Sequence, residues 1–103
     1  MTALRERLEQ LLAAGRDDAL LRFSLGSACL ADMPALAAQH LEAALAHDPR
    51  YSAAWKLLGK ARELLEDKPG AEAAYVQGIA AAEARGDVQA AKEMKVFLAR
   101  LRR

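Results

Sequence analysis

WKLLGKARELLEDKPGAEAAYVQG, residues 55–78 of this 103-residue chain, predicts a helical hairpin. Apolar residues recur three and four positions apart on both sides of residues 67–70, Asp-Lys-Pro-Gly, which are typical of a turn. This spacing predicts two helices, the second over residues 71–84. Because the turn between them is short, we expect the two helices to lie antiparallel.

The same pattern occurs 33 to 34 residues earlier in the chain. A glycine in the middle of a helix allows a partner helix to approach closely, and small residues favour the points where helices cross. A fixed period of this length is typical of stacked hairpins rather than of a closed bundle. The recurring residues are Leu25 and Gly26, matched by Leu58 and Gly59, and Ala37, Leu41 and Ala44, matched by Ala71, Tyr75 and Gly78.

Composition extends the helical prediction to the whole chain. Alanine (25) and leucine (17) are abundant, whereas the β-branched residues that favour strands are scarce. Glycines and prolines divide the chain into about six helical segments. We therefore expect an all-α protein, an α-solenoid of antiparallel helical hairpins in a single domain over residues 1–103. Its parts are an N-terminal half-repeat helix (2–15), repeat 1 (18–49), repeat 2 (50–85) and a C-terminal capping helix (87–103).

At these residues the chain resembles the tetratricopeptide repeat (TPR) family, as a small bacterial-type member with two recognisable units. Repeat 2 departs from the family pattern at Arg62 and Glu83, and repeat 1 departs from it at Arg22 and Cys29. The resemblance implies a non-enzymatic protein–protein interaction module that binds a peptide or partner helix in a concave groove. The residues that carry it best are Trp55, Leu58, Gly59, Ala71, Tyr75 and Gly78.

The sequence gives no support for catalysis, a metal site or a cofactor. His40 and His47 lie seven residues apart, about 10 Å along a helix axis, which is too far for one metal ion to bind both. We interpret both histidines as solvated surface residues. Cys29 lies on an apolar stripe and is interpreted as a buried small hydrophobe. The protein is therefore predicted not to be an enzyme.

The predicted peptide-binding face follows one stripe on the first helix of each repeat. The paired lysines of this stripe resemble part of the clamp with which some proteins of the family bind a C-terminal carboxylate, although a solvated face or an apolar peptide groove fits them as well. Counting one repeat further along the chain leads to the last helix. There Gln89, Lys92 and Glu93 stand where the repeat pattern has its aromatic residue, leucine and glycine. It also extends the stripe to Ala90, Met94 and Phe97, which we expect to pack on the preceding helix instead. The predicted peptide-binding residues are Phe23, Ser27, Leu30, Lys56, Lys60 and Glu63.

Two alternative functions remain open. A stripe of leucines in the first helix, or an apolar stripe in the last, could pair with a second copy across a two-fold axis to form a homodimer. A weak interaction with nucleic acid or another anionic surface is the more distant alternative, because residues 88–103 carry five basic residues against Glu93. Charged residues near the N-terminus, in place of a signal peptide, predict a cytoplasmic protein without a membrane partner. The leucines are Leu4, Leu8, Leu11 and Leu12, and the basic residues are Lys92, Lys95, Arg100, Arg102 and Arg103.

Overall fold

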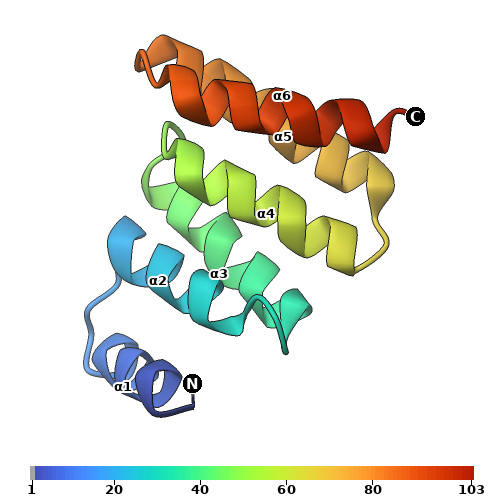
Figure 1. The fold of residues 1–103 in the computed structure, drawn as a ribbon. Helices are drawn as coiled ribbons and strands as arrows, with labels where there is room; N and C mark the ends of the chain where they lie inside the picture. Colours follow the sequence, from blue (N-terminus) through green and yellow to red (C-terminus); the bar gives the residue numbers. More distant parts are fainter. Residues whose placement is uncertain (1) are drawn as a thin grey trace.

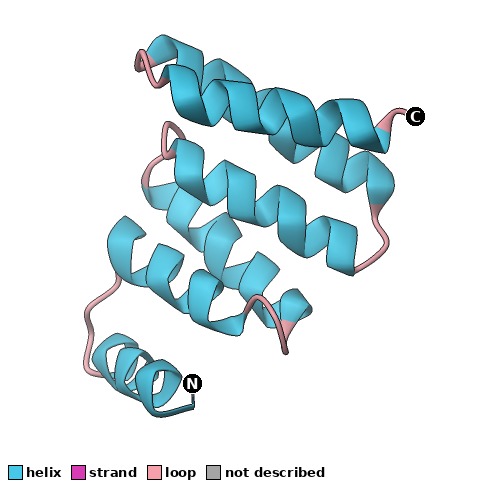
Figure 2. Cartoon of the chain, in the orientation of Figure 1, coloured by secondary structure: helices cyan, strands magenta, loops and turns pink. Residues whose placement is uncertain are grey.

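The computed structural model describes residues 2–103 and contains six α-helices joined by short loops (Figures 1 and 2). No strand occurs in these residues, so the prediction of an all-α protein is confirmed. The helices are α1 (Thr2–Ala13), α2 (Ala19–Cys29), α3 (Pro34–His47), α4 (Ser52–Leu64), α5 (Lys68–Ala84) and α6 (Val88–Leu101).

The helices are stacked one after another in chain order. Helices α2 and α3 form one antiparallel hairpin, α4 and α5 form the next, and α6 packs on α5 (Figure 1). The molecule is elongated, with extents of 41 × 28 × 19 Å. This arrangement confirms the predicted α-solenoid.

Aspartate side chains fix the starts of three helices. The carboxylates of Asp18, Asp67 and Asp87 each accept a hydrogen bond from the backbone N–H three residues further on, at 2.7, 3.0 and 3.1 Å. Because Asp67 is such a cap, α5 begins at Lys68, and the predicted start at residue 71 was wrong. Proline is tolerated in the first helical turn, so Pro69 does not delay the helix.

In each of the two hairpins, a glycine of the first helix lies against a large residue of the second helix, and the two large residues occupy equivalent repeat positions. A Cβ atom added at Gly26 would lie 2.5 Å from Cγ of Leu41, and one added at Gly59 would collide with the ring of Tyr75. Both Leu41 and Tyr75 are fully buried. The close approach predicted from the repeated glycines is therefore confirmed.

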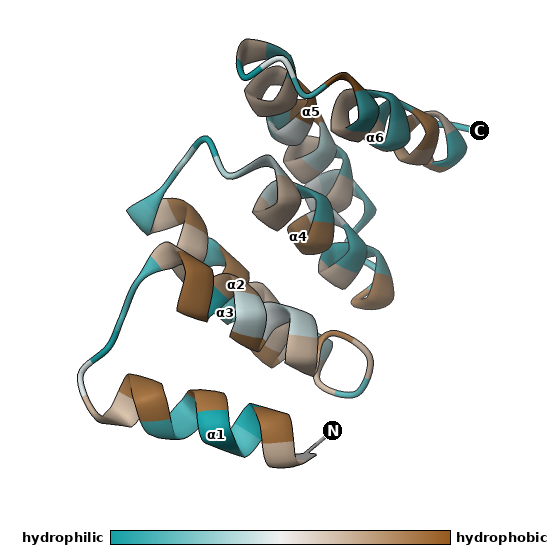
Figure 3. Ribbon diagram, turned by 60° about the vertical axis from the view of Figure 1, so that its left-hand side comes forward, coloured by the Kyte–Doolittle hydropathy of each residue, from teal (hydrophilic) through white to brown (hydrophobic). Residues whose placement is uncertain are grey.

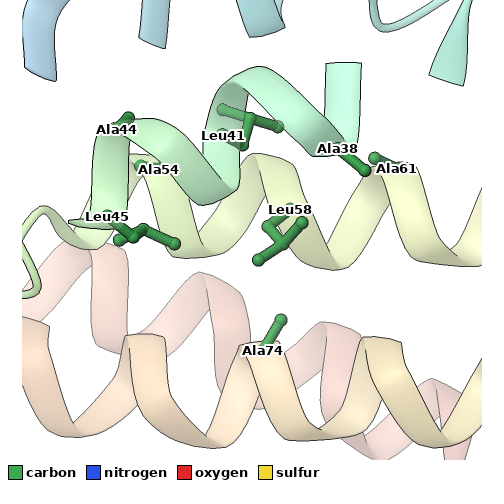
Figure 4. Packing of buried hydrophobic residues seen from close by; sticks show 8 residues of the cluster. All are labelled: Ala38, Leu41, Ala44, Leu45, Ala54, Leu58, Ala61 and Ala74. Atoms are coloured by element: carbon green, nitrogen blue, oxygen red, sulfur yellow. The ribbon is translucent and has the colours of Figure 1, made fainter. Parts of the chain in front are cut away.

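The core lies between the hairpins and consists mostly of alanine and leucine (Figure 4). Cys29 is fully buried, as predicted, and burial raises the pKa of its thiol. Trp55 is only partly buried, and its indole N–H donates to the carbonyl oxygen of Pro49 at 2.9 Å. The cluster shown in Figure 4 contains Ala38, Leu41, Ala44, Leu45, Ala54, Leu58, Ala61 and Ala74.

Helix α6 is equivalent to α2 and α4, the first helices of the two repeats, but its alignment with α4 differs from the 34-residue spacing predicted from the sequence. The residues that precede α2, α4 and α6 are Asp18, Tyr51 and Asp87, so the spacing is 33 residues at the first step and 36 at the second. The difference arises because α5 has 17 residues and α3 has 14. The position of Leu58 is therefore taken by Met94, which is fully buried, and not by Lys92, which is exposed.

Helix α1 is the least covered of the six helices. It packs against α2 alone among the described helices, and none of its residues from 3 to 13 is buried. Leu4 and Leu11 are 50% and 38% exposed. Apolar segments therefore lie along α1 at the end of the stack (Figure 3).

Candidate functional site

Five of the six predicted binding residues lie on two helices that contact each other, α2 and α4, and the sixth, Leu30, directly follows α2. The 33-residue spacing of these helices gives each residue of α2 an equivalent on α4. The equivalent pairs are Phe23 with Lys56, Ser27 with Lys60, and Leu30 with Glu63.

On α4, each predicted binding residue contacts another part of the same chain. The ammonium group of Lys56 lies 3.1 Å from the Glu93 carboxylate, and that of Lys60 lies 3.4 Å from the centre of the Phe97 ring. The Tyr75 hydroxyl donates a hydrogen bond to Glu63. Burial and this carboxylate raise the pKa of Tyr75 above its usual range. These three side chains therefore stabilise the packing of α5 and α6.

On α2, the predicted binding residues face different surroundings. Ser27 is exposed, whereas Leu30 packs against the core cluster. The Phe23 ring is stacked on that of Tyr51, with 4.9 Å between the ring centres. Phe23 is half-buried against the same core cluster as Leu30, so Ser27 and the uncovered part of Phe23 are the surface that this half of the stripe presents.

A groove of about 740 Å³ runs between α1 and α2 and includes both of these residues. Its walls are mainly apolar. Sequence reasoning noticed the leucine stripe on the first helix but did not connect it with α2, and that stripe is the only signal in the sequence that points to this part of the molecule. The groove is lined by Leu4, Leu8, Phe23, Ser24, Ser27, Ala28, Ala31 and Asp32.

A polar network ties the start of α2 to α3. Both Asp17 oxygens accept from the Arg22 guanidinium, at 2.8 and 3.0 Å, and one of them lies 3.0 Å from Nε2 of His47. Arg22 also donates to Nδ1 of His40 at 3.1 Å. His40 is buried, so the prediction that it is solvated was wrong, because Arg22 at the aromatic position of the repeat reaches over it. His47 is exposed, as predicted.

We expect protonation of His40 to destabilise the fold. Burial, and then the nearby positive charge of Arg22, lower the pKa of His40 below its usual value of 6.5. The unfolded chain therefore binds a proton that the folded chain resists, so stability should be complete above pH 6.5 and fall as the pH decreases below it. Urea denaturation at pH 7.5, 6.5 and 5.5 measures this change in the free energy of unfolding.

A His40→Gln variant should lose less stability across that pH range, because glutamine can accept from Arg22 but cannot be protonated. The His47→Gln variant keeps His40 and should still lose stability below pH 6.5. Equal losses in wild type and His40→Gln would show that other groups cause the acid sensitivity.

The fold and the groove define a small helical-repeat protein with an apolar surface at its N-terminal end. The chain belongs to the tetratricopeptide repeat family. It is 54% identical over 99 residues to the TPR repeat-containing protein PA0015 of Pseudomonas aeruginosa, covering 95% of this chain and 94% of that protein. A search of protein-family models finds no match to the chain.

A solved structure shares the fold of this chain. The solution structure of protein BPP2914 from Bordetella parapertussis matches the fold with a TM-score of 0.84 and 50% sequence identity, over 98% of this chain and 89% of that chain. Membership of this family suggests a protein–protein interaction module. None of the helices in residues 2–103 is both long and apolar enough to cross a membrane.

Proposed function

We propose that this protein binds a peptide or helix of another protein in the groove between α1 and α2, as a non-enzymatic adaptor or scaffold in the cytoplasm. The observation that carries the proposal is the exposure of Leu4 and Leu11 on a helix that none of the described helices except α2 packs against. Apolar surface gathered beside a groove is typical of an interaction site. Phe23 and Ser27 join this surface to the concave stripe predicted from the sequence.

The rest of the stripe is a weaker candidate for ligand binding. A ligand carboxylate would have to replace Glu93 at Lys56 and Phe97 at Lys60, and these contacts position α6. We therefore favour an apolar or amphipathic ligand over a C-terminal carboxylate. Lys56, Lys60 and Glu63 remain part of the proposed face as its outer edge.

Selection from a displayed library of 16-residue peptides tests this proposal. Peptides enriched on wild type should bind a Leu8→Glu variant at least about tenfold more weakly, because a carboxylate would face the apolar walls of the groove. A Lys92→Glu variant, changed on an exposed residue of α6, should bind them as wild type does. The proposal fails if no peptide is enriched, or if Leu8→Glu leaves the affinities unchanged while its melting curve matches wild type.

Self-association is the alternative that the same observation favours. Two copies could cover the leucines of α1 mutually across a two-fold axis. Sedimentation at increasing protein concentration separates this alternative from the proposal, since a module with a free groove stays monomeric. The basic C-terminal helix supports a nucleic-acid role less well, because Lys95 pairs with Glu83 at 3.0 Å and Arg102 with Glu72 at 3.6 Å.

A further inference from the structure

We propose that the partner in the α1–α2 groove is an amphipathic helix that completes a repeat unit, with a small residue packed on Leu8. This inference rests on the proposed function and adds the chemistry of the partner. Its basis is that α1 precedes α2 and packs on it, as α3 precedes α4 and packs on it. Helix α3 is also covered by α2, whereas no second helix within residues 2–103 covers α1.

The repeat register identifies the equivalent residues of α1 and α3. Asp18 and Tyr51 precede α2 and α4 and are 33 residues apart, so Leu8 corresponds to Leu41. By the same spacing, Leu4 and Leu11 correspond to Ala37 and Ala44, Arg5 corresponds to Ala38, and Leu12 corresponds to Leu45.

One row of residues on α1 is covered and the other is not. Arg5, Leu8 and Leu12, which correspond to the α3 residues that pack with α4 in the core, are partly buried. Leu4 and Leu11 are exposed, whereas Ala37 and Ala44, at the equivalent positions of α3, are fully buried. Helix α2 packs on α3, with Gly26 against Leu41. The uncovered row of α1, Leu4 and Leu11, is therefore equivalent to the row of α3 that α2, the first helix of its repeat, covers.

The α2 wall of the groove agrees with this assignment. Ser24 and Ala28 line the groove and correspond to Leu57 and Ala61 of α4. Ala61 belongs to the core cluster, and Leu57 packs against that cluster together with Phe23 and Leu30. Both walls of the groove thus match the surface that α3 and α4 present to α2.

Size and charge describe the partner helix further. In both complete hairpins a glycine faces the large residue equivalent to Leu8, so a large side chain there would be overpacked. Arg7 corresponds to His40, which contacts Arg22, four residues before Gly26. An acidic residue four positions before the small residue would therefore face the exposed Arg7. Since the partner lies antiparallel to α1, its last turn lies near Asp32. The carboxylate of Asp32 lies 3.4 Å from the Arg5 guanidinium and is still largely exposed, so a basic residue in that last turn could share it.

The chain's own helices fit this description poorly. Helices α2 and α4 are already packed in the core, and α6 has Lys95 at the position of Gly59 in its 36-residue register. A lysine at that position cannot approach Leu8 as a small residue can. The partner helix is therefore assigned to another protein.

Synthetic peptides test the inference directly. The probe carries the sequence of residues 18–33 with Arg22→Glu and Cys29→Ser, and the matched control adds Gly26→Leu. We expect fluorescence anisotropy to show that the probe binds the wild-type protein and that the control binds about tenfold more weakly or worse. In a Leu8→Ala protein this order should reverse, because the leucine of the control then fills the space left by Leu8.

A charge exchange provides an independent test. An Arg7→Glu protein should bind the probe more weakly and should recover affinity for the peptide that keeps the original Arg22. The inference is overturned if the probe does not bind, if glycine and leucine peptides bind equally, or if the Leu8→Ala protein keeps the wild-type order. In each of these cases, groove-dependent binding of library peptides would still support the proposed function. A dimer that Leu4→Glu abolishes would assign the groove to a second copy and overturn both.

Discussion

Tyr75→Ala is expected to lower the free energy of unfolding by about 3–5 kcal/mol. Tyr75 is the largest of the fully buried side chains, and its ring lies between Gly59 of α4 and Phe97 of α6. Its removal leaves a cavity shared by three helices. A domain of this length has roughly 5–15 kcal/mol of stability, so the loss should lower the melting temperature by about 12–40 °C. Thermal denaturation followed by circular dichroism measures the change.

Tyr75→Phe distinguishes the contribution of the ring to stability from that of the hydroxyl group. Phenylalanine keeps the packing against Gly59 and loses only the hydrogen bond to Glu63, which is partly exposed and can be hydrated instead. The expected loss is about 1–2 kcal/mol. If Tyr75→Ala melted within a few degrees of Tyr75→Phe, the ring could not be a main packing element between α4, α5 and α6.

The sequence predicted the features that depend on short-range spacing. The close approach of a partner helix at Gly26 and Gly59 follows from helical periodicity within one hairpin, and a repeat of the pattern made the prediction stronger. The residues that these glycines meet, Leu41 and Tyr75, are known from the structure. The burial of Cys29 followed for the same reason. Such contacts are set by the helix geometry and by a short loop, so one sequence is enough to infer them.

Features that depend on the length of a helix could not be inferred in this way. Each residue added to α5 rotates the next helix, so the equivalence of Met94 with Leu58 required knowing where α5 ends. The packing of Met94 on α5 was predicted and is confirmed. The contacts of Lys56 and Lys60 depend in turn on where α6 lies.

The groove was missed for a different reason. The leucines of α1 have the spacing of a covered face, and the sequence does not reveal that only one row of them is covered. The burial of His40 was missed because it depends on Arg22 reaching across from α2, which is a choice of rotamer and not a pattern.

Gly26→Leu is expected to destabilise the protein by about 3 kcal/mol or more. Even the first added carbon would lie 2.5 Å from Cγ of Leu41, which is fully buried and cannot move into solvent. Overpacking of a well-filled core typically costs about 1–3 kcal/mol, and a leucine adds four carbons at this point. Urea denaturation measures the loss, which should exceed by far the helix-propensity gain of about 1 kcal/mol on replacing glycine.

A smaller change at the same site distinguishes packing from backbone effects. Gly26→Ala in the wild-type background should be destabilising, because the collision with Leu41 outweighs the gain in helix propensity. In a Leu41→Ala background the same change should become stabilising, since its methyl group enters the space left by the leucine and the propensity gain remains. A Gly26→Ala effect of the same sign and size in both backgrounds would mean that glycine is required for the backbone of α2 and not for the approach of α3.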